Sequence, residues 1–265
     1  MNHNAKEGTI KFKDCSKDYL VFGNGYTPLV LIQGLNIARL KRGKWTQPVR
    51  YKLYAEQFRV YMVDRRDPLP ENITVEEIAD DVANAIKALG VHKAYVMGNS
   101  QGGMIAQYFA LKHPEMVEKL VLNVTTATTD DPVLTENVRH WSELAGRGDL
   151  DTISNEMMDM LYPPGKAPKT GWLMKKLYAL RDNRPANEFK TLTEACLTCD
   201  TLDRLHEIKC PVLVMGGKQD KVISCQSSLK IAEALGTEAY LFDDLGHAAY
   251  ETKEYQERVI KFINE

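Results

Sequence analysis

The feature that most constrains this chain is a G-x-S-x-G pentapeptide at Gly98–Gly102. A short β-rich run, Lys93–Met97, precedes it, and Gly103–Leu111, which has apolar residues at helical spacing, follows it. A strand, a sharp turn and a helix in this order raise the hydroxyl of Ser100 above the edge of a sheet. The two flanking glycines lack Cβ atoms, so the strand and the helix can approach closely around the serine. The sequence therefore predicts a reactive serine at the head of a helix.

Segments with strand and helix patterns alternate along most of the 265-residue chain. We expect strands at Thr9–Lys13, Tyr19–Phe22, Pro28–Ile32, Val60–Val63, Lys93–Met97, Leu120–Val124, Pro211–Met215 and Ala239–Phe242. We expect helices at Trp45–Phe58, Thr74–Leu89, Gly103–Leu111, Ser227–Leu235 and Glu251–Ile263. Thr74 and Glu77 have the spacing of a capping box. This alternation predicts an α/β fold with a mostly parallel, eight-stranded sheet flanked by helices.

The pattern changes between residues 125 and 206. Helical stretches there are separated by Gly146–Gly148, Pro163–Gly165 and Arg184-Pro185, and we find no convincing strand pattern. We therefore expect residues 1–124 and 207–265 to form the core domain, and residues 125–206 to be an inserted helical lid.

The expected lid is rich in methionine and aromatic residues. Most of these side chains should pack against the core domain. A lid also lines the pocket that it covers, so we expect several of them to form an apolar, adaptable substrate site, and we single out Met160 and Trp172.

Composition excludes several classes of function. Hydrophobic residues make up 44% of the chain, charged residues 26%, and the formal net charge is -2, so there is no basic excess to attract nucleic acid. The first residues are polar, and no apolar run approaches the roughly 20 residues that span a bilayer. The 5 cysteines lack the spacing of a secreted disulfide scaffold. We expect a cytoplasmic monomer or homodimer that acts on a small molecule, with no nucleic-acid or membrane partner.

A serine nucleophile needs a base within hydrogen-bond reach and an acid that orients the base. Asp220 and His247 follow Ser100 in that chain order, and each lies just past an expected strand. Because the carboxyl ends of parallel strands meet at one edge of a sheet, we predict that Ser100, Asp220 and His247 form a catalytic triad. Asp243 and Asp244 are other carboxylates, but they lie too near His247 in sequence to reach its ring easily.

On these residues the chain resembles the α/β-hydrolase superfamily, and in particular its lidded carboxylesterases, enol-lactonases and carbon–carbon bond hydrolases. The resemblance covers the chain outside the expected lid. It implies an oxyanion hole formed by the backbone amides of Gln101 and Leu35, and no metal or organic cofactor. It also implies cleavage of an ester or related acyl bond of a small, largely apolar substrate through an acyl-enzyme. A lactonase or carbon–carbon bond hydrolase with the same triad, or a binding module with little turnover, are the alternatives.

Two loops depart from the pattern of that family. Gln33 stands where the family commonly has histidine, and we expect it to brace the loop and to alter the polarity of the pocket. The segment that begins at Asp64 has the sequence DRRDPLP in place of a Gly-rich turn. Arg65 and Arg66 there either face the pocket and favour an acidic substrate, or lie in a solvated loop. For Asp64 we expect a structural role only.

One cluster has the residue types of a zinc site: Cys196, Cys199, His206 and Cys210. The first two cysteines, however, lie in a helical stretch, and Cys210 opens a strand. Because a buried free cysteine often packs as a small hydrophobic residue, we expect no metal site here.

Overall fold

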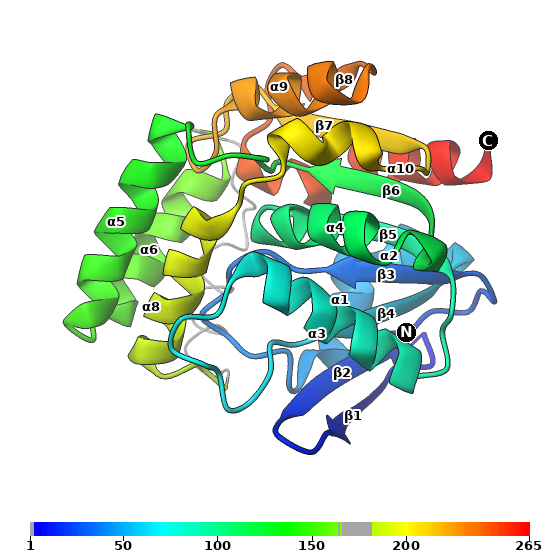
Figure 1. Cartoon of the computed structure of the whole chain (residues 1–265), viewed down its shortest axis with the longest axis horizontal. Coiled ribbons are helices and arrows are strands. Elements are labelled where there is room, and N and C mark those ends of the chain that lie inside the picture. Colours follow the sequence, from blue (N-terminus) through cyan, green and yellow to red (C-terminus); the bar gives the residue numbers. More distant parts are fainter. Residues whose placement is uncertain (1–2, 164, 166–181) are drawn as a thin grey trace.

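The computed structural model of the protein describes residues 3–163, 165 and 182–265. It contains an eight-stranded sheet with the strand order β1-β2-β4-β3-β5-β6-β7-β8 (Figure 1). The strands are β1 (Lys6–Lys11), β2 (Ser16–Phe22), β3 (Pro28–Ile32), β4 (Arg59–Val63), β5 (Ala94–Asn99), β6 (Val117–Asn123), β7 (Val212–Gly217) and β8 (Ala239–Phe242). Strand β2 runs antiparallel to β1 and β4, and the other neighbouring pairs are parallel. The predicted fold class is confirmed.

The α-helices in the described residues are α1 (Gln47–Arg50), α2 (Lys52–Gln57), α3 (Val75–Ala88), α4 (Gln101–Lys112), α5 (Pro132–Gly146), α6 (Leu150–Leu161), α8 (Ala186–Ala195), α9 (Cys225–Leu235) and α10 (Lys253–Asn264). Short 3₁₀ helices are η1 (Gly43–Trp45), η2 (Pro114–Met116), η3 (Cys196–Thr198), η4 (Leu202–Glu207) and η5 (His247–Glu251).

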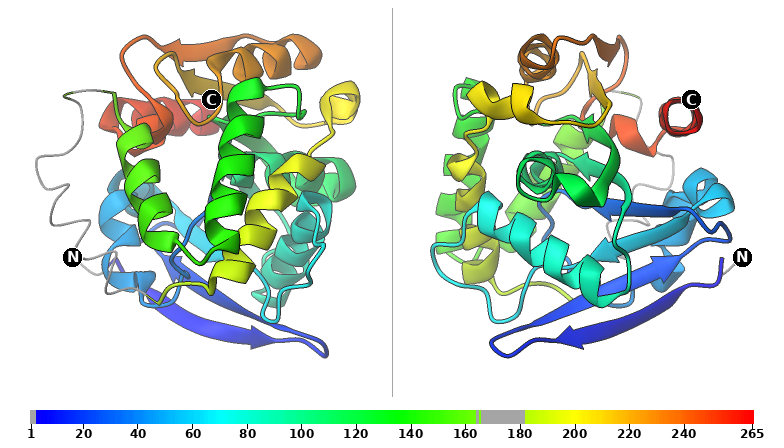
Figure 2. Two further views of the ribbon diagram at one scale, coloured as in Figure 1. Left: turned by 90° about the vertical axis from the view of Figure 1, so that its left-hand side faces the viewer. Right: turned by 45° about the vertical axis from the view of Figure 1, so that its right-hand side comes forward.

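The sheet is covered on both faces, which explains the continuous apolar pattern of its central strands. Because side chains alternate along a strand, Val30 and Ile32 of β3 pack under α3 and α4, whereas Leu29 and Leu31 pack towards α2 and α10. Figures 1 and 2 show these two helical layers on opposite faces of the sheet. Both faces are therefore occupied by packing, and the edge at the carboxyl ends of the strands is left for a site.

Helices α5, α6 and α8 lie side by side as a separate layer beyond the sheet (Figure 2). They come from the segment between β6 and β7 that we expect to be a lid. One bridge there, between Asn183 and Ala38, links this segment to the loop after β3. The layer therefore stands over the loops that follow the parallel strands.

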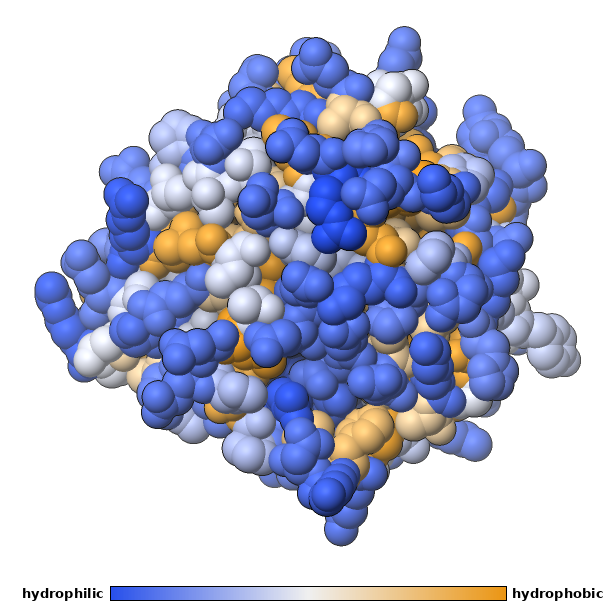
Figure 3. Space-filling view, viewed as in Figure 1, coloured by the Kyte–Doolittle hydropathy of each residue, from blue (hydrophilic) through white to orange (hydrophobic). Residues whose placement is uncertain are grey.

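The surface in Figure 3 is mainly hydrophilic, with apolar side chains scattered in small groups. Among the described residues, no helix combines the length and the apolar character that a membrane span requires.

The prediction of one continuous helix at Trp45–Phe58 was wrong. Pro48 lies in the first turn of α1, but the helix is interrupted at Tyr51, whose backbone angles, φ -110° and ψ 39°, are not helical. The side-chain amide of Gln256 donates to the Arg50 carbonyl at 3.0 Å, so α10 supplies a partner at the break. A tertiary contact of this kind is invisible in a local hydrophobic pattern.

The capping box of α3 is present as predicted. The Glu77 backbone N–H donates to Thr74 Oγ1 at 3.1 Å, and the Thr74 N–H donates to Glu77 Oε2 at 2.8 Å. Two of the orphan N–H groups at the start of this helix are thereby satisfied.

Candidate active site

Ser100 occupies the tight turn between β5 and α4, with φ 55° and ψ -124°. A residue with a side chain adopts such a backbone conformation only when its surroundings hold it there. A Cβ atom on Gly98 would lie 2.3 Å from the Gly102 carbonyl oxygen, and one on Gly102 would lie 2.1 Å from the Ile32 oxygen. The glycines of the pentapeptide are therefore required by close backbone approach, as the sequence predicted.

The end of β6 holds this turn in place. The Ser100 N–H donates to the Asn123 carbonyl at 2.9 Å, and Thr125 Oγ1 donates to the Ser100 carbonyl at 2.8 Å. Gly34, in the loop after β3, lies against the turn. A Cβ atom on Gly34 would be only 3.0 Å from Ser100 Cβ. The loop that carries Leu35 thus runs directly beside the serine.

Asp220 and His247 form a buried pair at the ends of β7 and β8. His247 Nδ1 lies 2.7 Å from Asp220 Oδ2, and the two side chains are 6% and 2% exposed, respectively. The other oxygen, Asp220 Oδ1, accepts the N–H groups of Val222 and Ile223 at 2.8 and 3.1 Å. These bonds fix the carboxylate, which in turn fixes the ring of His247. Asp243, in contrast, is exposed and pairs with Lys218.

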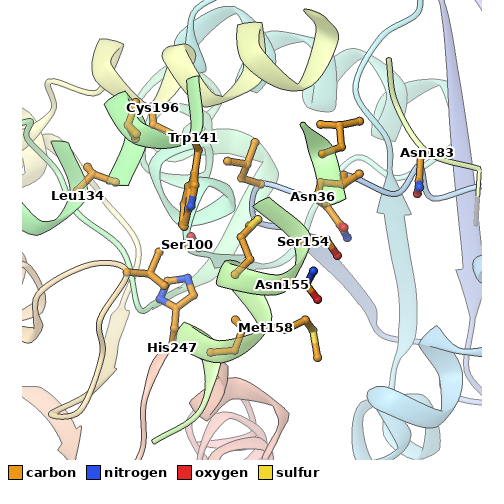
Figure 4. A pocket seen from close by; sticks show the side chains of 18 of the residues that line it. Asn36, Ser100, Leu134, Trp141, Ser154, Asn155, Met158, Asn183, Cys196 and His247 are labelled. Atoms are coloured by element: carbon orange, nitrogen blue, oxygen red, sulfur yellow. The ribbon is translucent and has the colours of Figure 1, made fainter. Parts of the chain in front are cut away.

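A cavity of about 360 Å³ opens between these loops and helices α5 and α6. Ser100 and His247 both line it, and Figure 4 shows their side chains on the same side of it. Through the hydrogen bond to His247, Asp220 joins them, so the structure brings the three predicted catalytic residues together. Leu35 also lines this cavity.

The other predicted site residues have different positions. Gln101 is buried at the first position of α4, where backbone N–H groups have no partner within the helix. Gln33 lines a separate small cavity behind the loop, and Met160 packs against the apolar core instead of lining the main cavity. We expected Met160 to line the substrate site, and this expectation was wrong. Trp172 lies outside the described residues.

The structure adds lining residues that the sequence analysis did not single out. Leu134, Val138 and Trp141 follow at intervals of four and three residues, and they place one face of α5 against the cavity. Helical periodicity within the segment could have identified this face. At the other side of the cavity Figure 4 shows polar side chains from three separate segments: Asn36, Ser154, Asn155 and Asn183. Only tertiary contacts bring these four together.

The position of Arg65 contradicts both interpretations of the DRRDPLP segment, the pocket-facing one and the solvated loop. It is buried, neither in a solvated loop nor in the lining of the main cavity. Its Nη2 donates to the Gln33 carbonyl at 2.9 Å and to Gln101 Oε1 at 3.0 Å. Burial, with the nearby Arg184 guanidinium, lowers the pKa of Arg65 to about 10. Arg65 thus joins the loop after β3 to the nucleophile turn. We expected the Gln33 side chain to brace this loop, but the bond is made by the Gln33 main-chain carbonyl.

The neighbours of Arg65 are structural. Arg66 pairs with Asp14 and lies 3.7 Å from Asp81, away from the main cavity. Asp64 accepts the Leu40 N–H at 2.7 Å and pairs with Arg184. The acidic-substrate hypothesis for the two arginines therefore has no support in their positions.

Cys196 belongs to the same buried region. The Gln101 amide nitrogen donates to its Sγ at 3.2 Å and to the Leu192 carbonyl at 2.5 Å, which ties the nucleophile turn to α8. Burial raises the pKa of Cys196 to about 11, and burial also raises that of Cys199. Within residues 3–163, 165 and 182–265, no group of three histidine, cysteine or acidic side chains is arranged to hold a metal ion.

Comparison with known proteins gives the family. Residues 27–254 match the family model described as the alpha/beta hydrolase fold. The chain belongs to the α/β-hydrolase fold family.

Individual members of the family resemble the chain at low sequence identity. It is 27% identical over 227 residues to the proposed carbamate hydrolase RutD of Rhizobium rhizogenes, covering 79% of this chain and 84% of that protein. It is 25% identical over 262 residues to 2-hydroxy-6-oxononadienedioate/2-hydroxy-6-oxononatrienedioate hydrolase 1 of Dechloromonas aromatica, covering 92% and 87%. The esterase EaEST of Exiguobacterium antarcticum superimposes with a TM-score of 0.82 at 19% identity, covering 98% and 100%. That likeness shows the fold.

Proposed function

We propose that this α/β-hydrolase is a serine hydrolase that cleaves an ester or related acyl bond of a small, largely apolar substrate. One observation carries the proposal: a backbone-constrained serine shares a cavity with a histidine whose other ring nitrogen is held by a buried carboxylate. This is the arrangement that nucleophilic acyl transfer needs.

In the proposed reaction Ser100 Oγ attacks the substrate carbonyl carbon, and His247 Nε2 takes the hydroxyl proton. Asp220 holds the ring through Nδ1 and stabilises the imidazolium that forms. The backbone amides of Gln101 and Leu35 donate to the oxyanion, with the N-terminal end of α4 behind it. His247 then gives the proton to the leaving group, and water cleaves the acyl-enzyme by the same steps in reverse order.

Helices α5, α6 and α8 act as the lid in this proposal, which keeps the division into a core at 1–124 and 207–265 and a lid at 125–206. The cavity of about 360 Å³ lies near the lower end of the range of small-molecule sites. Its α5 side presents Leu134, Val138 and Trp141, which favours an apolar group on one part of the substrate.

A fluorophosphonate probe tests the nucleophile, because the probe labels only an activated serine. We expect one label on Ser100, located by peptide mass spectrometry, and loss of p-nitrophenyl butyrate hydrolysis by several orders of magnitude in Ser100→Ala. Ser154→Ala is the matched control, since Ser154 also lines the cavity but is not in the nucleophile turn. Absence of labelling in the folded wild-type protein would favour a binding module on this fold.

A panel of acyl donors tests the bond that is cleaved. For p-nitrophenyl esters, kcat/KM should rise from acetate to butyrate by up to about fourfold per methylene, and fall once the cavity is full. A decline from acetate onwards contradicts an apolar acyl site. Labelling of Ser100 without turnover of any ester directs the search to the lactonase or carbon–carbon bond hydrolase alternative, which uses the same triad.

A further inference from the structure

The side of the cavity away from α5 carries asparagine side chains from separate segments of the chain. Asn36 follows the proposed oxyanion donor Leu35, Asn155 lies on α6, and Asn183 lies just before α8. Figure 4 shows these asparagine side chains on the opposite side of the cavity from Trp141. The cavity therefore has an apolar side and a hydrogen-bonding side.

Backbone contacts hold two of these asparagines in place. Asn36 Oδ1 accepts the Ala38 N–H at 3.2 Å, which fixes the amide and leaves its NH₂ group to donate elsewhere. The backbone of Asn183 forms a bridge with that of Ala38, and the Arg184 N–H donates to the Ile37 carbonyl at 2.9 Å. Because these bonds join the two segments, both amides are positioned before any ligand binds. A preorganised site of this kind loses less conformational entropy on binding.

The amides of Asn155 and Asn183 are accessible to a bound molecule. Both residues are exposed, and within the part of the chain that the structure describes their side chains form no hydrogen bond. Each amide offers a carbonyl acceptor beside an NH₂ donor. A hydroxyl group also donates and accepts, so it can bond to either end of an amide, whereas an alkyl group can bond to neither. The lining is therefore suited to hydroxyl groups.

The charges on this side of the cavity disfavour an anion. Asp151 lines the cavity one helical turn before Asn155, and it forms no ion pair with any described residue. Arg50 also lines the cavity, but it is paired with Glu251. A bound carboxylate would therefore meet Asp151, which repels it. A bound ammonium group would offer no acceptor to the NH₂ groups of the asparagines.

We propose that this amide-lined side binds the alcohol portion of the substrate, and that this portion is neutral and carries hydroxyl groups. The inference rests on the proposed function, which places an apolar acyl group against α5 and so leaves the alcohol portion on the other side. It narrows the substrate class to esters of an apolar acid with a polyol. The polyol leaves when the ester C–O bond breaks and His247 gives its proton to the alcohol oxygen.

A series of butyrate esters with alcohol portions of equal size tests the inference. The alcohol portions are 2,3-dihydroxypropyl, its alkyl counterpart 2-methylbutyl, the cationic 2-(dimethylammonio)ethyl and the anionic 2-carboxyethyl. Each kcat/KM is divided by the rate constant of hydroxide-catalysed hydrolysis, which corrects for the intrinsic reactivity of the ester. We expect the wild-type protein to prefer the dihydroxypropyl ester to each of the others by about fivefold or more, the effect of one or two net hydrogen bonds.

Replacement of an amide should reduce that preference. Asn155→Leu and Asn183→Leu nearly keep the size of the side chain and remove its donor and acceptor. In each variant we expect the preference for dihydroxypropyl over 2-methylbutyl to fall by about threefold. Asn187→Leu is the matched control, since Asn187 is an exposed asparagine on α8 that does not line the cavity. Thermal unfolding checks the folding of each variant.

The carboxylate is tested by a change of charge alone. Asp151→Asn should raise the rate of the 2-carboxyethyl ester relative to the 2-methylbutyl ester by about threefold at low ionic strength, and by less at high salt. Glu254→Gln is the matched control, because Glu254 is also the second residue of its helix, is exposed and does not line the cavity. An unchanged ratio in Asp151→Asn overturns the role of this carboxylate.

The outcomes separate this inference from the proposed function. Failure of the wild-type protein to label with fluorophosphonate and to hydrolyse p-nitrophenyl esters overturns the proposed function, and this inference with it. A protein that hydrolyses those esters but leaves the dihydroxypropyl ester intact, or favours the alkyl or a charged ester, overturns the inference alone. A dihydroxypropyl preference that persists unchanged in both Asn155→Leu and Asn183→Leu also overturns it, because the amides are then not the groups that recognise the hydroxyls.

Discussion

Two buried carboxylates, each just past the end of a strand, have a similar local structure and different partners. Asp220 follows β7, and its Oδ1 accepts the N–H groups of Val222 and Ile223. Asp64 follows β4 and accepts the N–H groups of Leu40 and Arg65 at 2.7 and 2.8 Å. In both places backbone N–H groups hold a carboxylate in a fixed orientation.

The partners decide what each carboxylate can do. Asp220 bonds to the imidazole of His247, a ring whose nitrogens can both accept and donate a proton. Asp64 pairs with the guanidinium of Arg184, which has hydrogen-bond donors and no acceptor and so holds its neighbours in place. Burial and position at a strand end are therefore not enough to identify a catalytic carboxylate. The comparison teaches that the partner, which comes from a distant part of the chain, makes the difference.

The largest expected effect is on catalysis at the first carboxylate. Asp220→Asn should lower kcat by about three to four orders of magnitude, because the amide no longer selects the required tautomer of His247 or stabilises its protonated form. Steady-state kinetics on p-nitrophenyl butyrate measures this loss, with thermal unfolding of the same protein as the check on folding. Activity within tenfold of wild type would mean that another carboxylate orients His247.

At the second carboxylate the expected effect is on stability. Asp64→Asn removes the nearer anion of the buried Arg184 guanidinium and leaves Glu188 Oε2 at 3.8 Å, which should cost about 3–5 kcal/mol of unfolding free energy. The Tm should then fall by about 6–20 °C. Asp67→Asn is the matched control, because the Asp67 side chain is 59% exposed and lies 3.9 Å from Arg39. Equal Tm values for the two variants would contradict the structural role of Asp64.

A smaller effect is expected at Arg65, which follows Asp64 in the chain and donates to Gln101, the residue after Ser100. Arg65→Met should lower kcat about tenfold and change KM by at most about twofold, because Gln33 and Gln101 lie beside the proposed oxyanion donors. Arg66→Met, at the surface pair with Asp14, should leave kcat unchanged. A rise in KM with constant kcat would show that Arg65 acts on ground-state binding instead.

The pKa of Arg65 gives the sign of its contribution to stability. Its folded-state pKa of about 10 is below the ordinary value of a guanidinium, so the unfolded chain binds the proton more tightly. The charged Arg65 therefore costs stability at neutral pH, and the cost decreases as the pH rises through the interval between these two values. For this reason Arg65→Met should lower the Tm less than Asp64→Asn does.

The smallest expected effect is at an exposed carboxylate in a helix cap. Glu77→Ala removes the acceptor of the Thr74 N–H in the capping box of α3. The loss should be at most about 1 kcal/mol, or up to about 4 °C in Tm, with unchanged kcat. Thermal unfolding followed by circular dichroism measures it. A larger shift would show that the surface carboxylate is more than a local cap.

Local chemistry made much of the fold and of the candidate site predictable. The alternation of patterns indicated the eight strands, and the glycines around Ser100 indicated the sharp turn, because their backbone approaches are short-range. Asp220 and His247 could be chosen as partners of Ser100 because they follow it in the expected chain order and lie just past the ends of parallel strands. The break at Tyr51 was not predictable, since its partner Gln256 comes from the last helix.

The sequence by itself therefore determined the α/β fold and pointed to the three residues proposed as a triad, because periodicity and strand-end positions are properties of neighbouring residues. Only the tertiary structure decided that Arg65 is buried between Gln33 and Gln101 and that Met160 packs against the core. Hydrogen bonding and burial depend on which distant segments meet. A one-dimensional pattern does not contain that information.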